Sequence, residues 1–275
     1  MICRALLIMA LAAGNALAHG SLHAQVAELT RSISREPGNA RLYLKRGELH
    51  RQHREWQAAQ ADFDAVRRLD PGAVDVELAA SRLAADRGLL AQSEAGLGRY
   101  LAARPNSEVA WALRADLRDR MGQYPAAAAD YANAIAASAE PRAEYYLGQA
   151  QALSRAGQDE AALEAVEGGS ARLGPLPVLE QWSIEHLVRM RRWDEALAGL
   201  DRTLSSTPRK EMALTRRAEI LALAGRHVDA LATFESARAS WDALPERIRA
   251  TGAMIDLQQR IDAGVDGLLG ATARL

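Results

Sequence analysis

The chain contains few of the residues that usually carry out chemistry. Its 275 residues include one cysteine, Cys3, and two phenylalanines, and aromatic residues make up 5% of the total. A single cysteine excludes a disulfide within the chain and any metal site built from several thiolates. The formal net charge is −1, so the sequence also lacks the cationic excess with which proteins bind nucleic acids.

Sequence motifs of common enzymes are missing as well. The chain has no Gly-rich phosphate loop, no HExxH and no GxSxG. His186 and His227 fall at positions where we expect roles in the core or in turns. We therefore predict a non-enzymatic protein without a cofactor.

The N-terminus has the pattern of an export signal. Arg4 precedes an apolar run over residues 5–13, and Ala16-Leu17-Ala18 has the small-x-small form of a cleavage site. The apolar run is too short for the roughly 20 residues that span a bilayer. We expect residues 1–18 to be a signal peptide, with a mature chain that starts at His19, has no membrane span and resides in the periplasm.

A unit of 34 residues recurs six times, which is typical of a solenoid of stacked units. The array covers residues 40–242, with units at 40–73, 74–107, 108–142, 143–176, 177–210 and 211–244, the last running into the following turn. Each unit holds two amphipathic segments separated by a break, the pattern of a helical hairpin. The break is Gly88, Gly122, Gly157 or Gly225 in four units, where a left-handed residue can end the first helix. Arg54 and Arg191 take that place in the other two.

Small and large residues alternate at fixed positions of the unit. Gly47, Ala115, Ala150 and Ala218 allow the two helices of a hairpin to approach closely, and a second small position recurs as Ala59, Ala127, Ala162, Ala196 and Ala230. A large position recurs as Phe63, Leu97, Tyr131, Val166, Leu200 and Phe234. We expect the large residues to be core side chains shared between successive hairpins.

These positions resemble the tetratricopeptide repeat, in the exported bacterial type of such proteins. The first unit supplies Tyr43, Gly47, Trp56, Ala59, Phe63 and Pro71 in the places of the family pattern. The resemblance covers roughly residues 24–242 and implies an all-α, right-handed solenoid of about six helical hairpins that binds a protein or peptide. Ser93, Ile184, Glu77 and Glu180 depart from the pattern, so we expect less regular packing in the second and fifth units.

Both ends of the array need a cover. Val26, Leu29 and Ile33 have helical spacing, which predicts an N-terminal capping half-repeat within residues 19–39. At the other end Pro245 is predicted to start a single capping helix over residues 245–263. The glycine-punctuated tail, residues 264–275, is expected to be poorly ordered, with packing of Leu268 and Leu269 back on the last hairpin as the alternative.

The first helices of successive hairpins should line a concave groove, and that groove is our candidate binding site. Arginine offers a planar fork to carboxylates, which suits acidic side chains or a peptide C-terminus. The candidate residues are Arg41, Lys45, Arg82, Arg120, Arg155, Trp182, Glu185, Arg189 and Arg216. Trp182 is either an apolar anchor for a ligand or a packing residue against the fourth hairpin. The carboxylate clamp of some co-chaperones in the family is absent, because its positions hold Leu44, Glu48, Ala79, Val109 and Leu113.

Two alternatives to a protein-binding adaptor stay open. His50 and His53 are three residues apart on a predicted helix, and His19 and His23 lie near the mature N-terminus, so either pair is a candidate metal site. The second alternative is an accessory subunit of an envelope assembly or maturation complex.

Overall fold

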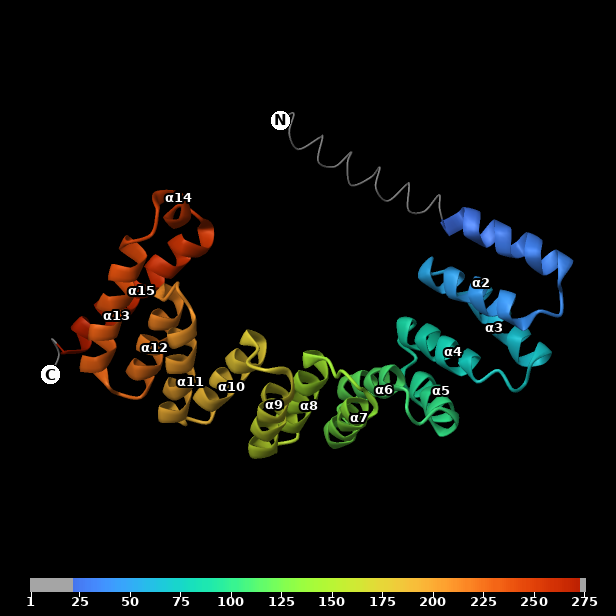
Figure 1. Ribbon diagram of the computed structural model, residues 1–275, viewed down its shortest axis with the longest axis horizontal. Coiled ribbons are helices and arrows are strands. Elements are labelled where there is room, and N and C mark those ends of the chain that lie inside the picture. Colours follow the sequence, from blue (N-terminus) through green and yellow to red (C-terminus); the bar gives the residue numbers. More distant parts are fainter. Residues whose placement is uncertain (1–21, 273–275) are drawn as a thin grey trace, which may run out of the picture. The chain divides into compact units, whose positions relative to one another are not determined.

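The computed structural model describes residues 22–272, and all regular secondary structure in this part of the chain is α-helical (Figure 1). It divides into two compact units, one ending at Gln158 and the other starting at Asp159. None of the helices in the described part combines the length and the apolar character needed to cross a membrane. The predicted signal peptide, residues 1–18, and His19 lie outside the described residues.

The first unit consists of hairpins that stack in chain order. A helix formed by residues 22–35 precedes α2 (Ala40–Gln52), α3 (Trp56–Leu69), α4 (Asp75–Asp86), α5 (Leu90–Ala103), α6 (Glu108–Arg120), α7 (Tyr124–Ala137) and α8 (Ala143–Arg155). Each of α2 to α7 contacts the next helix along the chain, and α2 with α4 and α6 with α8 also touch. The hairpins therefore stack on one another in chain order, as the solenoid prediction requires.

The second unit repeats this order. It contains α9 (Asp159–Leu173), α10 (Pro177–Arg189), α11 (Trp193–Ser206), α12 (Glu211–Leu223), α13 (His227–Asp242), α14 (Glu246–Arg249) and α15 (Gly252–Thr272). Contacts run from α9 to α13 in sequence, and α15 covers both α12 and α13. The prediction of an all-α solenoid of helical hairpins is confirmed within each unit.

The same backbone turn ends the first helix of every repeat. The turn residue has a positive φ, between 57° and 76°, at Gly88, Gly122, Gly157, Gly225, Arg54 and Arg191. In each case two backbone N–H groups reach back across it, as Glu55 N–H donates to His50 O at 2.9 Å and Arg54 N–H donates to Arg51 O at 3.0 Å. These two hydrogen bonds satisfy backbone carbonyl groups that have no hydrogen-bond donor within the helix at its C-terminal end. It outweighs the usual preference for glycine, since two arginines adopt the same conformation.

Close contact between a small and a large residue sets the distance between helices. Phe63 is fully buried and lies over Gly47, where an added Cβ would come within 2.6 Å of its ring. Tyr131 covers Gly148 in the same way, at 2.3 Å. All six large residues and the five recurring alanines are buried, so both sets of positions lie in the core.

The residues that depart from the pattern in the second and fifth repeats have local packing partners. In the fifth repeat α10 and α11 contact each other less extensively than the paired helices of the first, second, third and sixth repeats, which agrees with the expected irregularity. Ser93 is fully buried and its hydroxyl donates to the Ser81 carbonyl at 2.8 Å. Where Ile184 replaces a small residue, Gly199 on the partner helix makes room, since an added Cβ there would lie 2.8 Å from the Ile184 side chain. The large and small partners have exchanged helices, which keeps the summed volume suitable for close packing.

A repeated aromatic residue secures the loop before each of two hairpins. Tyr43 donates its hydroxyl to the Pro37 carbonyl at 3.2 Å, and Trp111 donates its indole N–H to the Pro105 carbonyl at 2.7 Å. Glu77 occupies this place in the second repeat. Burial raises its pKa, but hydrogen bonds from Arg67 and Arg99 outweigh burial and lower the pKa. The ion pairs of Glu77 with Arg67 and Arg99 therefore replace the aromatic contact.

Buried ion pairs recur between the two helices of a hairpin. Arg46 binds Asp62 through two bonds of 2.7 and 2.9 Å, and Arg114 binds Asp130 in the corresponding place of the third repeat. The second repeat has Ala80 and Gly96 at these two positions. Both partners are therefore absent together, and neither charge is left buried alone, which would be costly.

The C-terminal cap differs from the prediction of one helix over 245–263 and a poorly ordered tail. Two helices are present, and α15 runs through Gly264 because its apolar stripe continues to Val265 and Leu268, both buried. Gly264 does not end the helix. It lies beneath Phe234, whose ring would be only 2.3 Å from an added Cβ. The glycine that suggested a helix end instead makes room for the last large residue of the array.

We predict that Gly264→Ala lowers the free energy of unfolding by about 1–3 kcal/mol, because the new methyl group collides with the Phe234 ring. Gly267 is the matched control on the same helix, since an added Cβ there meets nothing within 4 Å. Gly267→Ala should stabilise the protein by up to about 1 kcal/mol through helix propensity. Urea unfolding of both variants checks this, and equal effects at the two sites would contradict the contact.

A second prediction concerns the buried carboxylates. Asp130, whose side chain is 2% exposed, accepts hydrogen bonds from Arg114 and Arg118. Asp130→Ala should destabilise the protein by about 3–5 kcal/mol, because it leaves the Arg114 guanidinium without its carboxylate, while Arg118 keeps its ion pair with Glu94. The control is Asp201, 56% exposed and paired with Arg217, where removal should cost less than about 1 kcal/mol. Thermal unfolding that shows the same loss for both variants would refute the distinction.

Candidate functional site

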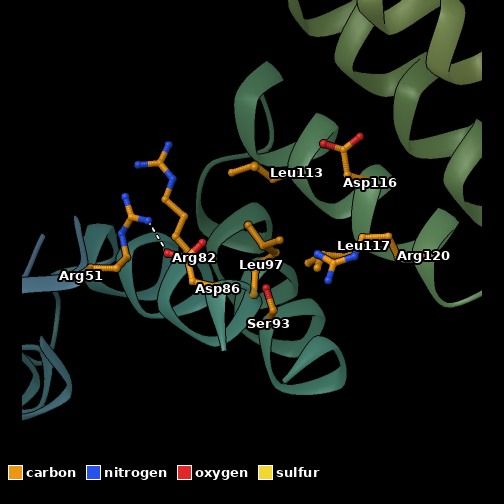
Figure 2. Close-up of a pocket in the computed structure, with 10 residues that line it drawn as sticks. Arg51, Arg82, Asp86, Ser93, Leu97, Leu113, Asp116, Leu117 and Arg120 are labelled. Carbon is orange, nitrogen blue, oxygen red and sulfur yellow. Dashed lines mark hydrogen bonds and ion pairs between the residues drawn. The ribbon is translucent and has the colours of Figure 1, made fainter. Parts of the chain in front are cut away.

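The first unit contains a groove between the first helices of its second and third repeats. Its volume is about 300 Å³, and Figure 2 shows its lining residues on α4, α5 and α6, with Arg51 reaching in from α2. The lining consists of Arg51, Arg82, Ala85, Asp86, Ser93, Leu97, Leu113, Asp116, Leu117 and Arg120. The groove therefore has both an apolar floor and a set of charges.

The floor of the groove is made by leucines. Leu97 and Leu117 are almost completely buried and belong to one hydrophobic cluster, against which the partly buried Leu113 packs. Leu97 is the large residue of the second repeat, so the same side chain that joins two hairpins also forms the bottom of the groove. The position of the floor is consequently fixed by the packing of the repeat.

The charges of the groove are only partly neutralised within the protein. Arg51 donates to Glu48 at 2.9 Å and to Asp86 at 2.5 Å, and Asp116 accepts from the Tyr131 hydroxyl. Burial and the hydrogen bond to Asp116 raise the pKa of Tyr131, so it remains a neutral donor. Within the described part of the chain, Arg82 and Arg120 form no ion pair. The two guanidinium groups are left to face solvent or a ligand.

A second hollow of about 350 Å³ continues the groove toward α8. It shares Leu113 and Asp116 with the first, and it is further lined by Val109, Ala112, Tyr131, Arg142, Glu144 and Tyr145. The Arg142 guanidinium lies 4.6 Å from the centre of the Tyr145 ring. The two hollows are therefore adjacent, with Leu113 and Asp116 of α6 bordering both.

The second unit has a wider groove of about 700 Å³ with balanced charges. It is lined by Pro177, Glu180, Gln181, Ile184, Glu185, Leu200, Thr203, Thr207, Met212, Ala213, Arg216 and Arg260. Arg216 binds Glu185 at 2.5 Å and Glu219 at 3.0 Å, and Arg260 binds Glu219 at 2.7 Å. Both arginines that face this groove are therefore paired, while Met212 is 58% exposed at its rim.

Only some of the candidate groove residues line a groove in the structure. Arg82 and Arg120 line the groove of the first unit, and Glu185 and Arg216 line that of the second. Arg41 and Lys45 are exposed on α2 and belong to neither lining.

Arg155 makes its contacts within the first unit. It pairs with Asp119, and its guanidinium carbon lies 5.9 Å from the centre of the Tyr124 ring. These contacts join α8 to α6 and α7. Arg155 is therefore a link between hairpins as well as an exposed cation.

Trp182 and Arg189 both contact His186. The Trp182 ring stacks on the imidazole, with centroids 4.6 Å apart and planes at 13°, and it packs against the core of the second unit. His186 is 1% exposed, and its Nε2 lies 3.0 Å from an Asp159 oxygen. Burial and the charge of Arg189 lower the pKa of His186, against the opposing effect of Asp159. His186 thus has the core role predicted for it, and Trp182 has a packing role.

Sequence reasoning missed several lining residues. Arg51 lies at the end of α2 and reaches the next repeat, while Arg260 belongs to the capping helix, where only the apolar stripe had been considered. Tyr145 and Met212 were also missed. Both lie in the first turn of a first helix, and the signal that could have found Met212 is its place one turn before Arg216.

The structure also brings two histidines from separate predicted metal pairs together. Within the described residues, one group of potential ligands has its donor atoms within 4.8 Å of one another, and it consists of His23, His53 and Glu55. His50, which the sequence analysis paired with His53, contacts Glu55 through Nδ1.

Comparison with known proteins agrees with the repeat geometry. The family model described as tetratricopeptide repeat matches residues 10–74 and 184–245. The C-terminal part of a TPR repeat-containing protein from Cytophaga hutchinsonii is similar with a TM-score of 0.66 at 10% identity, over 86% of this chain and 94% of that one. A tetratricopeptide repeat protein from Parabacteroides merdae gives 0.52 at 14% identity, over 89% and 94%. Pseudomonas aeruginosa pilF gives 0.51 at 13% identity, over 82% and 99%.

At these identities the solved structures share the fold with this chain, and no curated protein sequence matches it. The family model covers two stretches that include the first and last repeats, and the same hairpin, turn and packing positions recur between them. Residues 10–74 and 184–245 therefore match the tetratricopeptide repeat, and the described helices have the fold of tetratricopeptide repeat proteins.

Proposed function

We propose that this protein is a non-enzymatic scaffold that binds an acidic peptide segment of a client protein in the groove of its first unit. The observation that carries the proposal is the placement of Arg82 and Arg120 around a leucine floor, without ion-pair partners among the described residues. The repeat architecture supports it, because tetratricopeptide proteins generally act as scaffolds for protein–protein interaction.

The chemistry of the groove favours a carboxylate with an apolar neighbour. Each guanidinium can form two parallel hydrogen bonds to one carboxylate, and charge-assisted bonds of this kind are stronger than neutral ones. The exposed edge of Leu113 and the buried Leu97 and Leu117 beneath it offer an apolar surface to an adjacent side chain. A volume of about 300 Å³ lies at the small end of ligand pockets, which suits side chains of an extended peptide better than a cofactor.

The two grooves differ in what they would select. In the second unit both lining arginines already bind Glu185 or Glu219, and the exposed apolar residue is Met212. We assign charge selection to the first unit and a less specific apolar contact to the second. Met is suited to such contacts because its flexible side chain adapts to different partners.

We further propose that the protein works in the periplasm after removal of residues 1–18. The basis is the N-terminal sequence pattern alone, with a short apolar run and Ala16-Leu17-Ala18 before His19.

The expected result in a Gram-negative host is a periplasmic protein whose N-terminal residue is His19, as measured by Edman sequencing of the fractionated cells. Ala16→Arg together with Ala18→Arg should block processing and leave residues 1–18 attached, because the cleavage site needs small residues. An unprocessed parent protein in the cytosolic fraction would refute the proposal of export.

The peptide-binding proposal predicts that random peptides selected by phage display on the full chain are rich in Asp or Glu next to an apolar residue. For a selected peptide, Arg82→Glu with Arg120→Glu should weaken binding at least about tenfold, since each lost charge-assisted bond is worth about 1.5–3 kcal/mol. Fluorescence anisotropy measures the affinity. Added salt should also weaken binding, because Arg120 is exposed.

The matched control is Arg68→Glu with Arg104→Glu, which makes the same change of charge at exposed positions outside both grooves. This variant should bind the peptide like the parent. Selection without enrichment of acidic residues, or equal affinity of the groove variant and the parent, would overturn the proposed function.

A further inference from the structure

The turn between α2 and α3 gathers three metal-ligating side chains that the peptide groove does not use. The donor atoms of His23, His53 and Glu55 lie within 4.8 Å of one another. The two imidazole centroids are 4.9 Å apart, with their planes at 51°. His23 comes from the first turn of the helix formed by residues 22–35, so the group joins the N-terminal cap to the first hairpin.

The backbone of the turn explains why His53 and Glu55 lie together. His53 ends α2, with its N–H bonded to Leu49 O at 3.0 Å, and Glu55 is the N-terminal flanking residue of α3. Between them Arg54 has a φ of 60°, in the left-handed region. The chain reverses at this residue, so the side chains on either side of it can approach the same point while the arginine itself is exposed.

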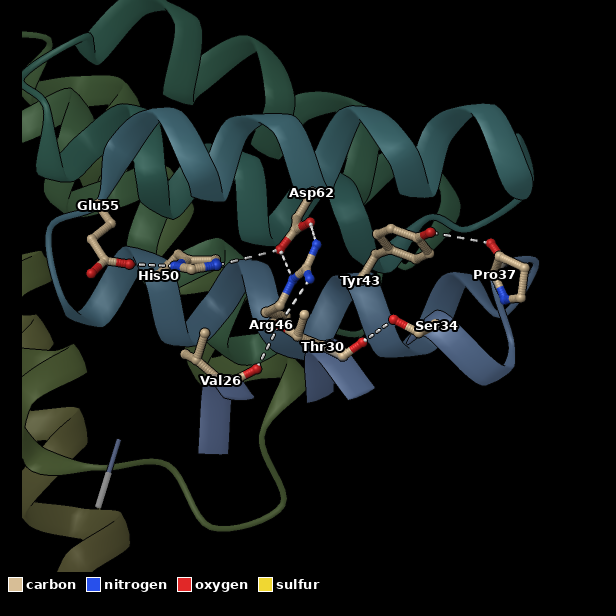
Figure 3. A network of polar contacts seen from close by, with 9 residues as sticks. All are labelled: Val26, Thr30, Ser34, Pro37, Tyr43, Arg46, His50, Glu55 and Asp62. Carbon is tan, nitrogen blue, oxygen red and sulfur yellow. Dashed lines mark hydrogen bonds and ion pairs between the residues drawn. The ribbon is translucent and has the colours of Figure 1, made fainter. Parts of the chain in front are cut away.

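A fourth residue fixes the carboxylate of the group. His50 Nδ1 contacts Glu55, and His50 Nε2 lies 3.9 Å from Asp62 Oδ2, as Figure 3 shows along the length of α2. Asp62 is in turn held by Arg46, whose guanidinium also donates to Thr30 in the helix formed by residues 22–35. The carboxylate is therefore connected to the same polar network that attaches this helix to the first hairpin.

We propose that His23, His53 and Glu55 bind one divalent transition metal ion, with Zn²⁺ as the fitting ion and water in a fourth position. Two imidazole nitrogens and one carboxylate oxygen form a ligand set that zinc accepts. Ligand atoms around tetrahedral zinc stand about 3.3 Å apart at bond lengths of about 2.0 Å. The present separations must close by a modest amount. His23 and Glu55 are both exposed and His53 is half-buried, and Glu55 can bind the ion through one carboxylate oxygen while the other keeps its contact with His50.

The bound ion would crosslink the N-terminal helix to the first hairpin. His23 lies on the capping helix, and the other two ligands lie on the turn of the first hairpin, so one ion would connect the two elements. An ion that binds only the folded state stabilises it in proportion to its occupancy. This inference does not depend on the peptide groove, because the two sites have no residue in common.

The test is titration of the chain starting at His19 with zinc chloride in an isothermal calorimeter. We expect one zinc ion per chain and a higher Tm when zinc is present. His23→Gln, His53→Gln and Glu55→Gln should each weaken binding by at least the roughly tenfold typical of losing a supporting group at a metal site. Cobalt(II) added in place of zinc should give the visible absorption of a four-coordinate site, and circular dichroism should show that each variant is folded.

Two control variants separate this site from other histidines. His227→Gln removes an exposed imidazole in the second unit and should leave zinc binding unchanged. His19→Gln tests a site at the mature amino terminus and should also leave it unchanged. The proposal is overturned if the parent takes up no zinc, if His23→Gln or His53→Gln binds like the parent, or if binding is lost only in His19→Gln.

Discussion

The contact between a large side chain and a position with little or no side chain determines the distance between helices, and most other features depend on it. Phe63 over Gly47, Tyr131 over Gly148 and Phe234 over Gly264 are three forms of this contact. Because the helices are held at this separation, successive hairpins stack in chain order. Side chains of first helices from two repeats can then line one groove, as Arg82 of α4 and Arg120 of α6 do.

The positive charge of the first groove depends on which arginines already form ion pairs within the protein. Arg46 and Arg114 bind aspartates inside their hairpins, and Arg216 binds glutamates beside the second groove. A net charge of −1 conceals this division, because paired and unpaired arginines count equally. In the proposed function, recognition of a client depends on the arginines that the repeat does not use for its own stability, and Arg82 and Arg120 at the first groove are two of these.

The sequence was sufficient for those features that depend on spacing along one chain segment. The repeat period, the left-handed turns at Arg54 and Arg191, and the buried large positions all follow from residues near one another in sequence. The extent of α15 did not follow, because Gly264 is explained only by the distant Phe234. Trp182 and His186 are four residues apart on α10, so their proximity does follow from helical spacing. The contact between Phe234 and Gly264 joins two helices, and the spacing within one repeat does not contain it.

The turns show how one repeated backbone can acquire a local function. Arg54 and Arg191 occupy equivalent turns with nearly the same φ, 60° and 57°. The residues beside Arg191 are Met190 and Arg192, whereas those beside Arg54 are His53 and Glu55. The hairpin requires the turn, so its backbone geometry is the same in both repeats. The flanking side chains are not constrained in this way, and they differ. Metal chemistry at the first turn is thus compatible with the repeat because the ligands occupy positions that the hairpin core leaves free.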